Sequence, residues 1–204
     1  MLKTRFNEDD KMVEVGVDEA GRGCLAGPVV AAAVILDPFI NDPRMQLIQD
    51  SKKLSEKKRV EARDFIEKHA YAYHVAFVSP ERIDEVNIRN ATFEAMHEAI
   101  EQVIGKFEPT RVRLLIDGNG FTPLRNVPHE CVVGGDNKYM AIAAAGILAK
   151  TYRDDYIVNM CVDDPELEKY GFLKNKCYGT KEHMDAIKKY GVTSCHRTSY
   201  APCK

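Results

Sequence analysis

Apolar residues recur along the chain with two different spacings, which separate predicted strands from predicted helices. Alternating valines in residues 12–17 predict a strand, and the continuous apolar run 27–36 has the length of a second strand. A short glycine-rich turn separates these two runs, so we expect them to pair as a hairpin. A further β-like run at 70–78 ends before Pro80 and predicts a third strand.

Apolar residues three and four positions apart predict helices in the rest of the chain. The first of them starts after Ser55, whose hydroxyl suits a helix N-cap, and the second ends before Gly105, a residue typical of helix ends. Two short apolar runs between the helices predict the remaining strands. We expect helices at about 55–69, 91–104, 138–158 and 181–190, and strands at 112–117 and 130–133.

The order of these elements predicts an α/β domain around a mixed sheet of about five strands. A chain of 204 residues with 45% hydrophobic residues can form one domain, or one domain with an appendage. We expect residues 1–160 to form the domain that contains the sheet. Residues 161–204 are expected to form a helical, basic, substrate-binding extension within the same compact unit.

Charge is distributed unevenly along the chain. The net charge is only −2, but residues 169–204 hold eight lysines and arginines against two acids, which leaves −8 for the rest. A second basic cluster occupies 51–59. Basic patches beside an acidic body are compatible with a ligand that has a phosphate backbone, whereas solvated surface lysines are the alternative for either patch alone.

Neither a membrane segment nor a disulfide framework is predicted. No apolar run approaches the roughly 20 residues that a membrane helix needs, and the charged N-terminus lacks the apolar core of a signal peptide. The six cysteines form no CxxC pair, which argues against a zinc site, and free thiols are the default without a secretory signal. We therefore expect a soluble, cytoplasmic protein without membrane association.

Acidic residues stand at the ends of three predicted strands, each time beside glycine. Asp18 and Glu19 end the first strand, Asp117 ends the strand at 112–117, and Asp136 follows the last strand. Because neighbouring side chains of a regular strand point to opposite faces, both members of the first pair can reach one cleft only if the strand stops there. A turn residue at 117 and a helix cap at 136 are the structural alternatives.

Four carboxylates in one cleft would raise one another's pKa and oppose folding unless a cation neutralised them. Mg²⁺ and Mn²⁺ prefer such oxygen ligands. Two such ions about 4 Å apart can clamp the attacking and leaving oxygens of a phosphoryl displacement. The acids therefore predict a metal site, and the Gly-Arg-Gly loop (residues 21–23) beside it can receive a phosphate or a sugar.

The motifs DEAGRG, DSKKL, IDGN, GGDNK, ILAKTYRD, YGTKEH and HRTSY occur in the order and spacing of prokaryotic ribonuclease HII. The resemblance spans about residues 13–200. It implies a ribonuclease H-like fold, with a mixed five-stranded sheet flanked by helices and a C-terminal helical extension. It also implies a two-metal-ion endoribonuclease, a type 2 ribonuclease H, that uses Mg²⁺ or Mn²⁺. Such an enzyme cleaves the RNA strand of RNA–DNA hybrids and cuts 5′ to single ribonucleotides in duplex DNA, leaving 3′-hydroxyl and 5′-phosphate ends.

The resemblance also assigns roles to individual residues. The family's four catalytic, metal-binding acids fall on Asp18, Glu19, Asp117 and Asp136. An enzyme that finds a single ribonucleotide must read its 2′-hydroxyl.

The implied substrate contacts lie outside the acids. Gly21, Arg22 and Gly23 match the loop that reads the RNA–DNA junction, and Ser51 and Lys52 match contacts to the backbone. Tyr178 matches a tyrosine that packs on the next deoxyribose. A surface ion pair for the arginine and a core position for the tyrosine are the alternatives.

Some matched positions carry no predicted catalytic role. We expect Lys150 and Arg153 to pair with Asp154 or Asp155, and we assign neither His183 nor His196 to catalysis. Departures from the family pattern lie at Tyr139, Gly146 and Cys177, and none of them removes a predicted metal ligand.

Two competing hypotheses remain. A non-catalytic nucleic-acid-binding module of the same fold is the alternative of a different class, and the presence of all four acids counts against it. Ribonuclease HIII carries an extra N-terminal substrate-binding domain, whereas here about a dozen residues precede the first strand. We expect a monomer whose partners are RNA–DNA hybrids and duplex DNA containing ribonucleotides.

Overall fold

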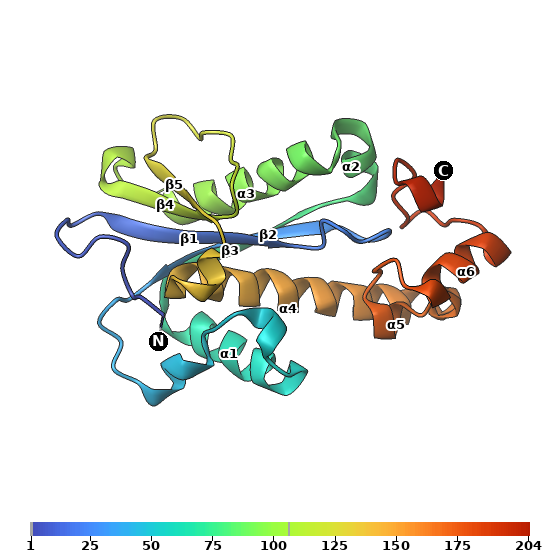
Figure 1. Cartoon of the computed structure of the whole chain (residues 1–204), viewed down its shortest axis with the longest axis horizontal. Coiled ribbons are helices and arrows are strands. Elements are labelled where there is room, and N and C mark those ends of the chain that lie inside the picture. Colours follow the sequence, from blue (N-terminus) through green and yellow to red (C-terminus); the bar gives the residue numbers. More distant parts are fainter. Residues whose placement is uncertain (1, 106) are drawn as a thin grey trace.

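The computed structural model describes residues 2–105 and 107–204, and these residues form a five-stranded sheet between two layers of helices (Figure 1). The strand order is β3-β2-β1-β4-β5. The β1–β2 and β2–β3 pairs are antiparallel, whereas β1–β4 and β4–β5 are parallel. The predicted α/β class and mixed sheet are confirmed. The strands are β1 Val13–Ala20, β2 Val29–Leu36, β3 Ala70–Val78, β4 Val112–Asp117 and β5 His129–Val132.

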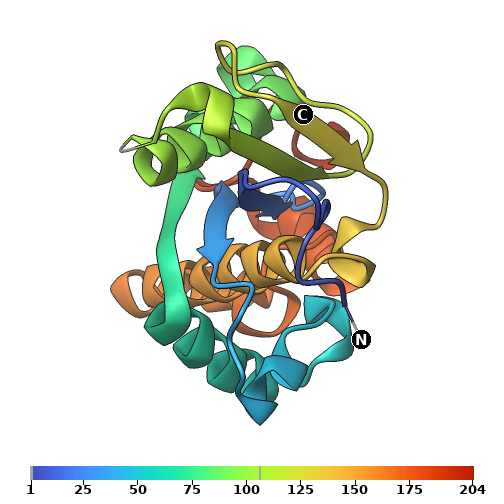
Figure 2. The same ribbon diagram turned by 90° about the vertical axis from the view of Figure 1, so that its left-hand side faces the viewer.

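Each face of the sheet is covered by helices (Figures 1 and 2). On one face lie α1 and α4, and on the other α2 and α3, while α5 and α6 follow α4 in the C-terminal part. The predicted cap is present, since the Ser55 hydroxyl accepts a hydrogen bond from the Lys58 amide at the start of α1. The helices are α1 Glu56–His69, α2 Pro80–Val86, α3 Ile88–Ile104, α4 Met140–Asp163, α5 Phe172–Asn175 and α6 Lys181–Tyr190.

Small residues allow α4 to lie directly against β1. A Cβ atom added to Gly16 would stand only 2.1 Å from the carbonyl carbon of Ala141, so the strand and the helix are in backbone contact there. The alanines of α4 from Ala143 to Ala145 are buried against the same face. This close approach brings the first two turns of α4 next to the C-terminal end of β1, where the acidic pair lies.

Among the residues that the structure describes, three apolar clusters hold the molecule together. One lies between α3 and the sheet, and the second lies between the sheet and the α1–α4 layer. The third joins the end of α4 and the C-terminal segments to Cys24, Leu25 and Ala26 of the β1–β2 connection. The C-terminal part is thus packed on the end of the sheet (Figure 1). Within the described residues, no helix is both long and apolar enough to cross a bilayer.

Candidate active site

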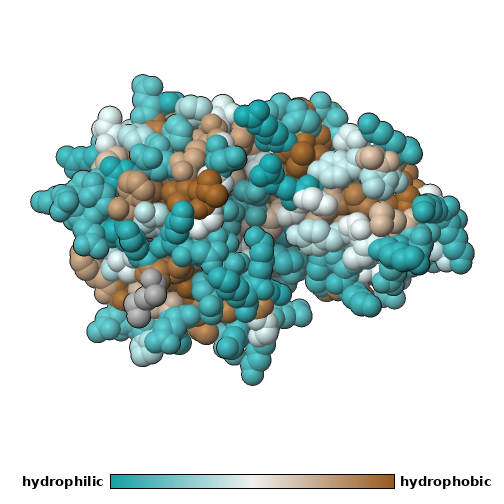
Figure 3. All heavy atoms as spheres, in the orientation of Figure 1, coloured by the Kyte–Doolittle hydropathy of each residue, from teal (hydrophilic) through white to brown (hydrophobic). Residues whose placement is uncertain are grey.

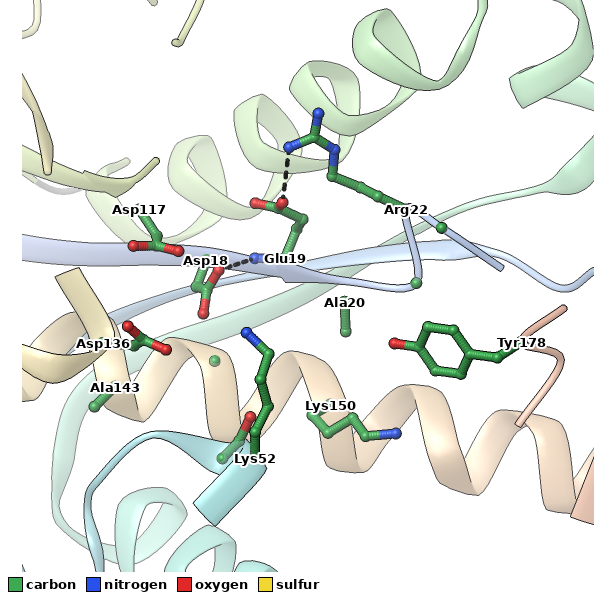
Figure 4. A pocket seen from close by; sticks show the side chains of 14 residues that line it. Asp18, Glu19, Ala20, Arg22, Lys52, Asp117, Asp136, Ala143, Lys150 and Tyr178 are labelled. Carbon is green, nitrogen blue, oxygen red and sulfur yellow. Dashed lines mark hydrogen bonds and ion pairs between the residues drawn. The ribbon is translucent and has the colours of Figure 1, made fainter. Parts of the chain in front are cut away.

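The four acidic residues singled out from the sequence line one pocket of about 220 Å³ at the end of β1 (Figure 4). Asp18 and Asp117 each follow the last pair of the β1–β4 ladder, which joins Val17 to Ile116. Asp136 belongs to a short 3-10 turn that precedes α4. Acids far apart in the chain therefore meet where two parallel strands separate.

The first strand does not stop at the acidic pair, so this part of the prediction is wrong. Asp18 and Glu19 still pair with Ala32 and Ala31, because β2 continues the antiparallel ladder beyond the point where β4 ends. Their side chains point to opposite sides of the strand, as Figure 4 shows. Glu19 reaches the pocket because the edge of β1 that faces β4 is open beyond Val17.

Burial and mutual repulsion make negative charge unfavourable in this pocket. Burial raises the pKa of Asp18 well above its usual value, and the charges of Glu19 and Asp117 raise it further. Burial also raises the pKa of Glu19, although its ion pair with Arg22 at 3.2 Å opposes the shift. The pKa of Asp117 is raised by burial as well. A bound cation would relieve the cost of ionising all three groups.

The donor set fits a hard divalent cation. Carboxylate oxygens from three separate segments line the pocket, with no histidine or cysteine among them, which matches the preference of Mg²⁺ and Mn²⁺. Within residues 2–105 and 107–204, no three acidic, histidine or cysteine side chains stand as close together as a closed ligand shell. Asp18 and Asp117 instead accept backbone N–H bonds from Glu19 and Gly135, both at 2.7 Å. Each of these two bonds uses Oδ1, which leaves Oδ2 of both carboxylates available to a cation.

Comparisons with known proteins decide the family. A sequence model of the family described as Ribonuclease HII matches residues 15–203. The protein named Ribonuclease HII from Porphyromonas gingivalis is 50% identical over 200 residues, which cover 98% of this chain and 94% of that protein. The chain belongs to the ribonuclease HII family. The protein named Ribonuclease HII from Parabacteroides distasonis is 53% identical to this chain over 189 residues, which cover 92% of this chain and 89% of that protein.

Solved structures of the wider family share the fold. Ribonuclease H2 from Pyrococcus horikoshii OT3 superposes with a TM-score of 0.75 at 22% identity, and the match covers 93% of this chain and 94% of that one. The PCNA:RNase HII complex from Archaeoglobus fulgidus gives 0.69 at 28% identity over 93% and 95% of the two chains. Bst-RNase HIII in complex with Mn²⁺ gives 0.72 at 16% identity and covers 96% of this chain but 69% of that one. The ribonuclease H-like fold is confirmed.

Membership of the ribonuclease HII family makes the chain a type 2 ribonuclease H, a hydrolase that acts on nucleic acid as a metal-dependent endoribonuclease. The alternative of a non-catalytic binding module is not favoured.

The other sequence-predicted residues line the same pocket as the acids. The Gly-Arg-Gly loop forms the start of the β1–β2 connection, and Ser51 and Lys52 come from a 3-10 turn before α1. The Lys52 side chain extends toward the acids, while Tyr178 of the C-terminal part faces the pocket beyond them (Figure 4). Figure 3, in the orientation of Figure 1, shows a mostly hydrophilic surface that is indented between the sheet and the C-terminal part.

Two residues that support this pocket were missed from the sequence. The Asp50 carboxylate accepts the Lys52 N–H at 3.0 Å and thereby caps the turn that presents this lysine. The Asn137 side-chain amide donates to Asp136 at 2.9 Å and to Asp50 at 3.4 Å. An aspartate two residues before Lys52 is a recognisable capping signal. The hydrogen bond from Asn137 to Asp50 spans 87 positions, and no local sequence pattern predicts it.

One expected ion pair exists and the other does not. Lys150 pairs with Asp154 at 2.6 Å, as expected. Arg153 instead is buried and donates to the backbone carbonyls of Pro28, Ala26 and Lys176 at 2.9–3.1 Å, so its expected carboxylate partner is wrong. Arg153 lies on the face of α4 that packs against the β1–β2 connection, and its guanidinium therefore meets the backbone carbonyls of Ala26 and Pro28 there.

The three departures from the family pattern lie in different local surroundings. The Tyr139 ring packs against Phe6 with 5.5 Å between centroids. A Cβ atom on Gly146 would lie 2.3 Å from Oδ2 of Asp18, so glycine leaves room for this carboxylate against α4. Cys177 is fully buried with a φ of 69°, a left-handed conformation that favours glycine.

A pair of buried histidines joins the Tyr178 segment to the C-terminal turn. Nδ1 of His196 accepts the Thr193 N–H at 3.0 Å, so its Nε2 carries the proton and donates to Nε2 of His183 at 3.1 Å. Nδ1 of His183 in turn donates to the Tyr178 carbonyl at 3.0 Å. A further proton on either ring would place two donors face to face, so both rings must be neutral.

Acidification should destabilise the protein through this pair. Burial lowers the pKa of both histidines, that of His196 to about 4 with His183 contributing. The pKa of each histidine is lower in the folded protein than in the unfolded chain, so the unfolded chain binds protons first as the pH falls. The free energy of unfolding is therefore highest above pH ~6.5 and decreases as the pH falls toward 4. For His196 the expected decrease in the free energy of unfolding is about 2–3 kcal/mol. Denaturant unfolding between pH 7 and 4.5 should show a flatter pH dependence for His196→Asn than for wild type.

The matched control for this prediction is His97→Asn, which removes a partly exposed histidine bound to the Thr122 carbonyl. It should keep the wild-type dependence of stability on pH. Equal slopes for wild type and His196→Asn would show that the buried pair does not carry the effect.

Proposed function

We propose that this chain cleaves the RNA strand of RNA–DNA hybrids and cuts 5′ to single ribonucleotides embedded in duplex DNA, leaving 3′-hydroxyl and 5′-phosphate ends. The single observation that carries the proposal is the shared pocket. Four acids, the Gly-Arg-Gly loop, Lys52 and Tyr178 all line it, although they come from five separate parts of the chain. This combination provides cation ligands, a phosphate contact and a surface for a sugar at one place.

In this proposal Asp18, Glu19, Asp117 and Asp136 hold two divalent ions, Mg²⁺ or Mn²⁺. Two bound ions supply electrostatic stabilisation of the attacking and leaving oxygens in an in-line displacement at phosphorus. The chain itself positions the four carboxylates and keeps their charges together in a partly buried site. The raised pKa values and the absence of soft ligands from the pocket support this assignment.

The remaining residues bind and orient the substrate. The Lys52 ammonium offsets the charge of the acids as a phosphate approaches, and Ser51 contacts the backbone beside it. Arg22 is more than half exposed, so it can exchange its ion pair with Glu19 for a phosphate. The backbone of Gly21 and Gly23 can approach a sugar closely because no Cβ intervenes.

Tyr178 would test the nucleotide that follows the ribonucleotide. The residue is 43% exposed and its ring faces the pocket, so the ring can pack on a deoxyribose there (Figure 4). A 2′-hydroxyl on that sugar would crowd the ring. Tyr178 belongs to residues 161–204, which supports the proposed role of this segment as a substrate-binding extension.

We further propose that the protein acts as a monomer in the cytoplasm. The acids and the predicted substrate contacts already meet within one copy of the chain, which is compatible with a monomer. The solved structure from Archaeoglobus fulgidus is named as a complex with PCNA, and we propose no such partner for this chain.

Three duplexes test the proposed function. A duplex with one ribonucleotide and an RNA–DNA hybrid should both be cut in Mg²⁺ or Mn²⁺, whereas an all-DNA duplex should remain intact. End analysis should find the cut 5′ to the ribonucleotide. Binding without cleavage would contradict the enzymatic role, and cleavage of the hybrid alone would indicate the substrate range expected of ribonuclease HIII.

A further inference from the structure

The C-terminal segment 196–200 has no part in the proposed chemistry, yet it holds the Gly-Arg-Gly loop from its buried side. The Arg197 guanidinium is fully buried, and all of its hydrogen bonds to the described residues go to carbonyl or hydroxyl oxygens. Nε and Nη2 donate to the Gly27 carbonyl at 3.0 and 2.9 Å, and Nη1 donates to the Arg22 carbonyl at 3.0 Å. Burying a guanidinium without a carboxylate costs free energy, which suggests that its position matters.

A second side chain reaches the same carbonyl. The Tyr200 hydroxyl donates to the Arg22 oxygen at 2.7 Å and accepts from Nη1 of Arg197 at 3.1 Å. Both lone pairs of the Arg22 carbonyl are therefore used. Because a peptide group is planar, two donors on its oxygen also fix the direction of its N–H group.

That N–H group belongs to Gly23. No cis peptide bond occurs among the described residues, so the Gly23 N–H points opposite to the Arg22 carbonyl, away from buried Arg197. Gly23 is exposed and lines the active-site pocket, and a Cβ atom on it would meet nothing within 4 Å. The Gly23 amide donates to no acceptor within residues 2–105 and 107–204. The loop thus presents an unused donor to the open side of the pocket.

We propose that Arg197 and Tyr200 are positioning residues that hold the Gly23 N–H ready to donate to an oxygen of the substrate strand. The acceptor is a ribose 2′-hydroxyl or a phosphate oxygen at the ribonucleotide. This inference rests on the proposed function of the pocket. A donor that is already oriented needs no reorganisation when the substrate binds, so loosening the loop should weaken binding more than it slows the chemical step.

The chain offers a matched control for the tyrosine. The Tyr170 hydroxyl donates to the Gly191 carbonyl at 2.9 Å within the same C-terminal cluster, without touching the loop. Tyr170→Phe and Tyr200→Phe each remove one hydroxyl bonded to a carbonyl. A loss caused only by a weaker C-terminal part should therefore appear in both variants.

The experiment compares wild type with Tyr200→Phe, Arg197→Lys and Tyr170→Phe. Affinity for a duplex with one ribonucleotide and for an all-DNA duplex is measured by fluorescence anisotropy without divalent ions. Tyr200→Phe should weaken binding of the ribonucleotide duplex about fivefold, and Arg197→Lys should weaken it more. In cleavage assays the change should appear mainly in KM. Tyr170→Phe should match wild type in both assays.

The two duplexes separate the possible acceptors. Weaker binding of the ribonucleotide duplex alone would assign the 2′-hydroxyl, and an equal loss on both duplexes would assign a phosphate oxygen. Wild-type affinity in Tyr200→Phe for both duplexes would overturn the proposal, and this holds even if Arg197→Lys does not fold.

Hydrogen exchange separates this inference from the proposed function. Amides of residues 20–27 should exchange faster in Tyr200→Phe than in wild type or Tyr170→Phe. This result does not depend on which substrate the protein cleaves. Unchanged exchange in Tyr200→Phe would contradict the positioning role. If wild type cut neither the ribonucleotide duplex nor the RNA–DNA hybrid but exchange rose as expected in Tyr200→Phe, the proposed function would fail and the positioning role would stand.

Discussion

Replacing Asp18 by asparagine should slow cleavage of a duplex with one ribonucleotide by about a thousandfold, the scale of losing a group that stabilises charge in the transition state. The fold should persist, because the amide occupies the same volume as the carboxyl. The unfolding temperature without divalent ions should stay equal or rise, since burial and the neighbouring acids oppose ionisation of Asp18. Initial rates in Mg²⁺ and thermal unfolding measure both effects.

Glu14→Gln provides the control on the same strand. Its carboxylate accepts the N–H groups of Phe6 and Asn7 at 2.8 and 3.1 Å and lies outside the pocket. This variant should lose stability and keep its cleavage rate, the opposite of Asp18→Asn. A wild-type rate in Asp18→Asn would contradict the role of this carboxylate in catalysis.

The sheet could be predicted because each strand carries its own local signal. Alternating valines in β1 and the apolar run of β2 reflect burial on the sheet, and the turn between them favours a hairpin. The meeting of Asp18 with Asp117 follows from the same logic, because the carboxyl ends of neighbouring parallel strands share one edge. Neither step requires knowledge of contacts between distant side chains.

The end of β1 could not be predicted, because it depends on its partners. The strand continues through Glu19 because β2 is long enough to pair with it, whereas β4 stops two residues earlier in the register. A glycine-rich sequence after Glu19 looks like a strand end whichever partner is present. Alternation along a regular strand places Asp18 and Glu19 on opposite sides, as observed, but the local pattern does not show that the open edge of β1 lets both reach one pocket.

The contacts that the C-terminal residues make with the β1–β2 connection could not be predicted from the sequence either. Arg197 reaches Gly27 across 170 positions, and the two buried histidines meet across 13. An arginine suggests an acidic partner, yet both Arg153 and Arg197 bind backbone carbonyls of the β1–β2 connection. Carbonyl groups are present at every residue, so no sequence pattern marks those that a buried guanidinium will contact.

Removal of divalent ions should abolish cleavage and lower thermal stability together. An ion at about 100 times its dissociation constant stabilises the folded state by about 2.7 kcal/mol. For a chain of this size such a gain raises the unfolding temperature by roughly 5–10 °C. The shift is expected because the ion offsets the repulsion among acids whose pKa values are raised by burial. Thermal unfolding with a chelator, and then with excess Mn²⁺ or Mg²⁺, measures it.

Two variants test whether the ion-dependent rise in unfolding temperature arises from ions bound in the pocket. Asp136→Asn removes one carboxylate that lines it, so both the ion-dependent shift and the restored activity should fall sharply. Glu14→Gln should unfold at a lower temperature with or without ions but keep the full shift, because its carboxylate lies elsewhere on β1. An undiminished shift in both Asp136→Asn and Asp18→Asn would place the bound ion outside the pocket. Ion-dependent cleavage would then have to arise from a site other than these four acids.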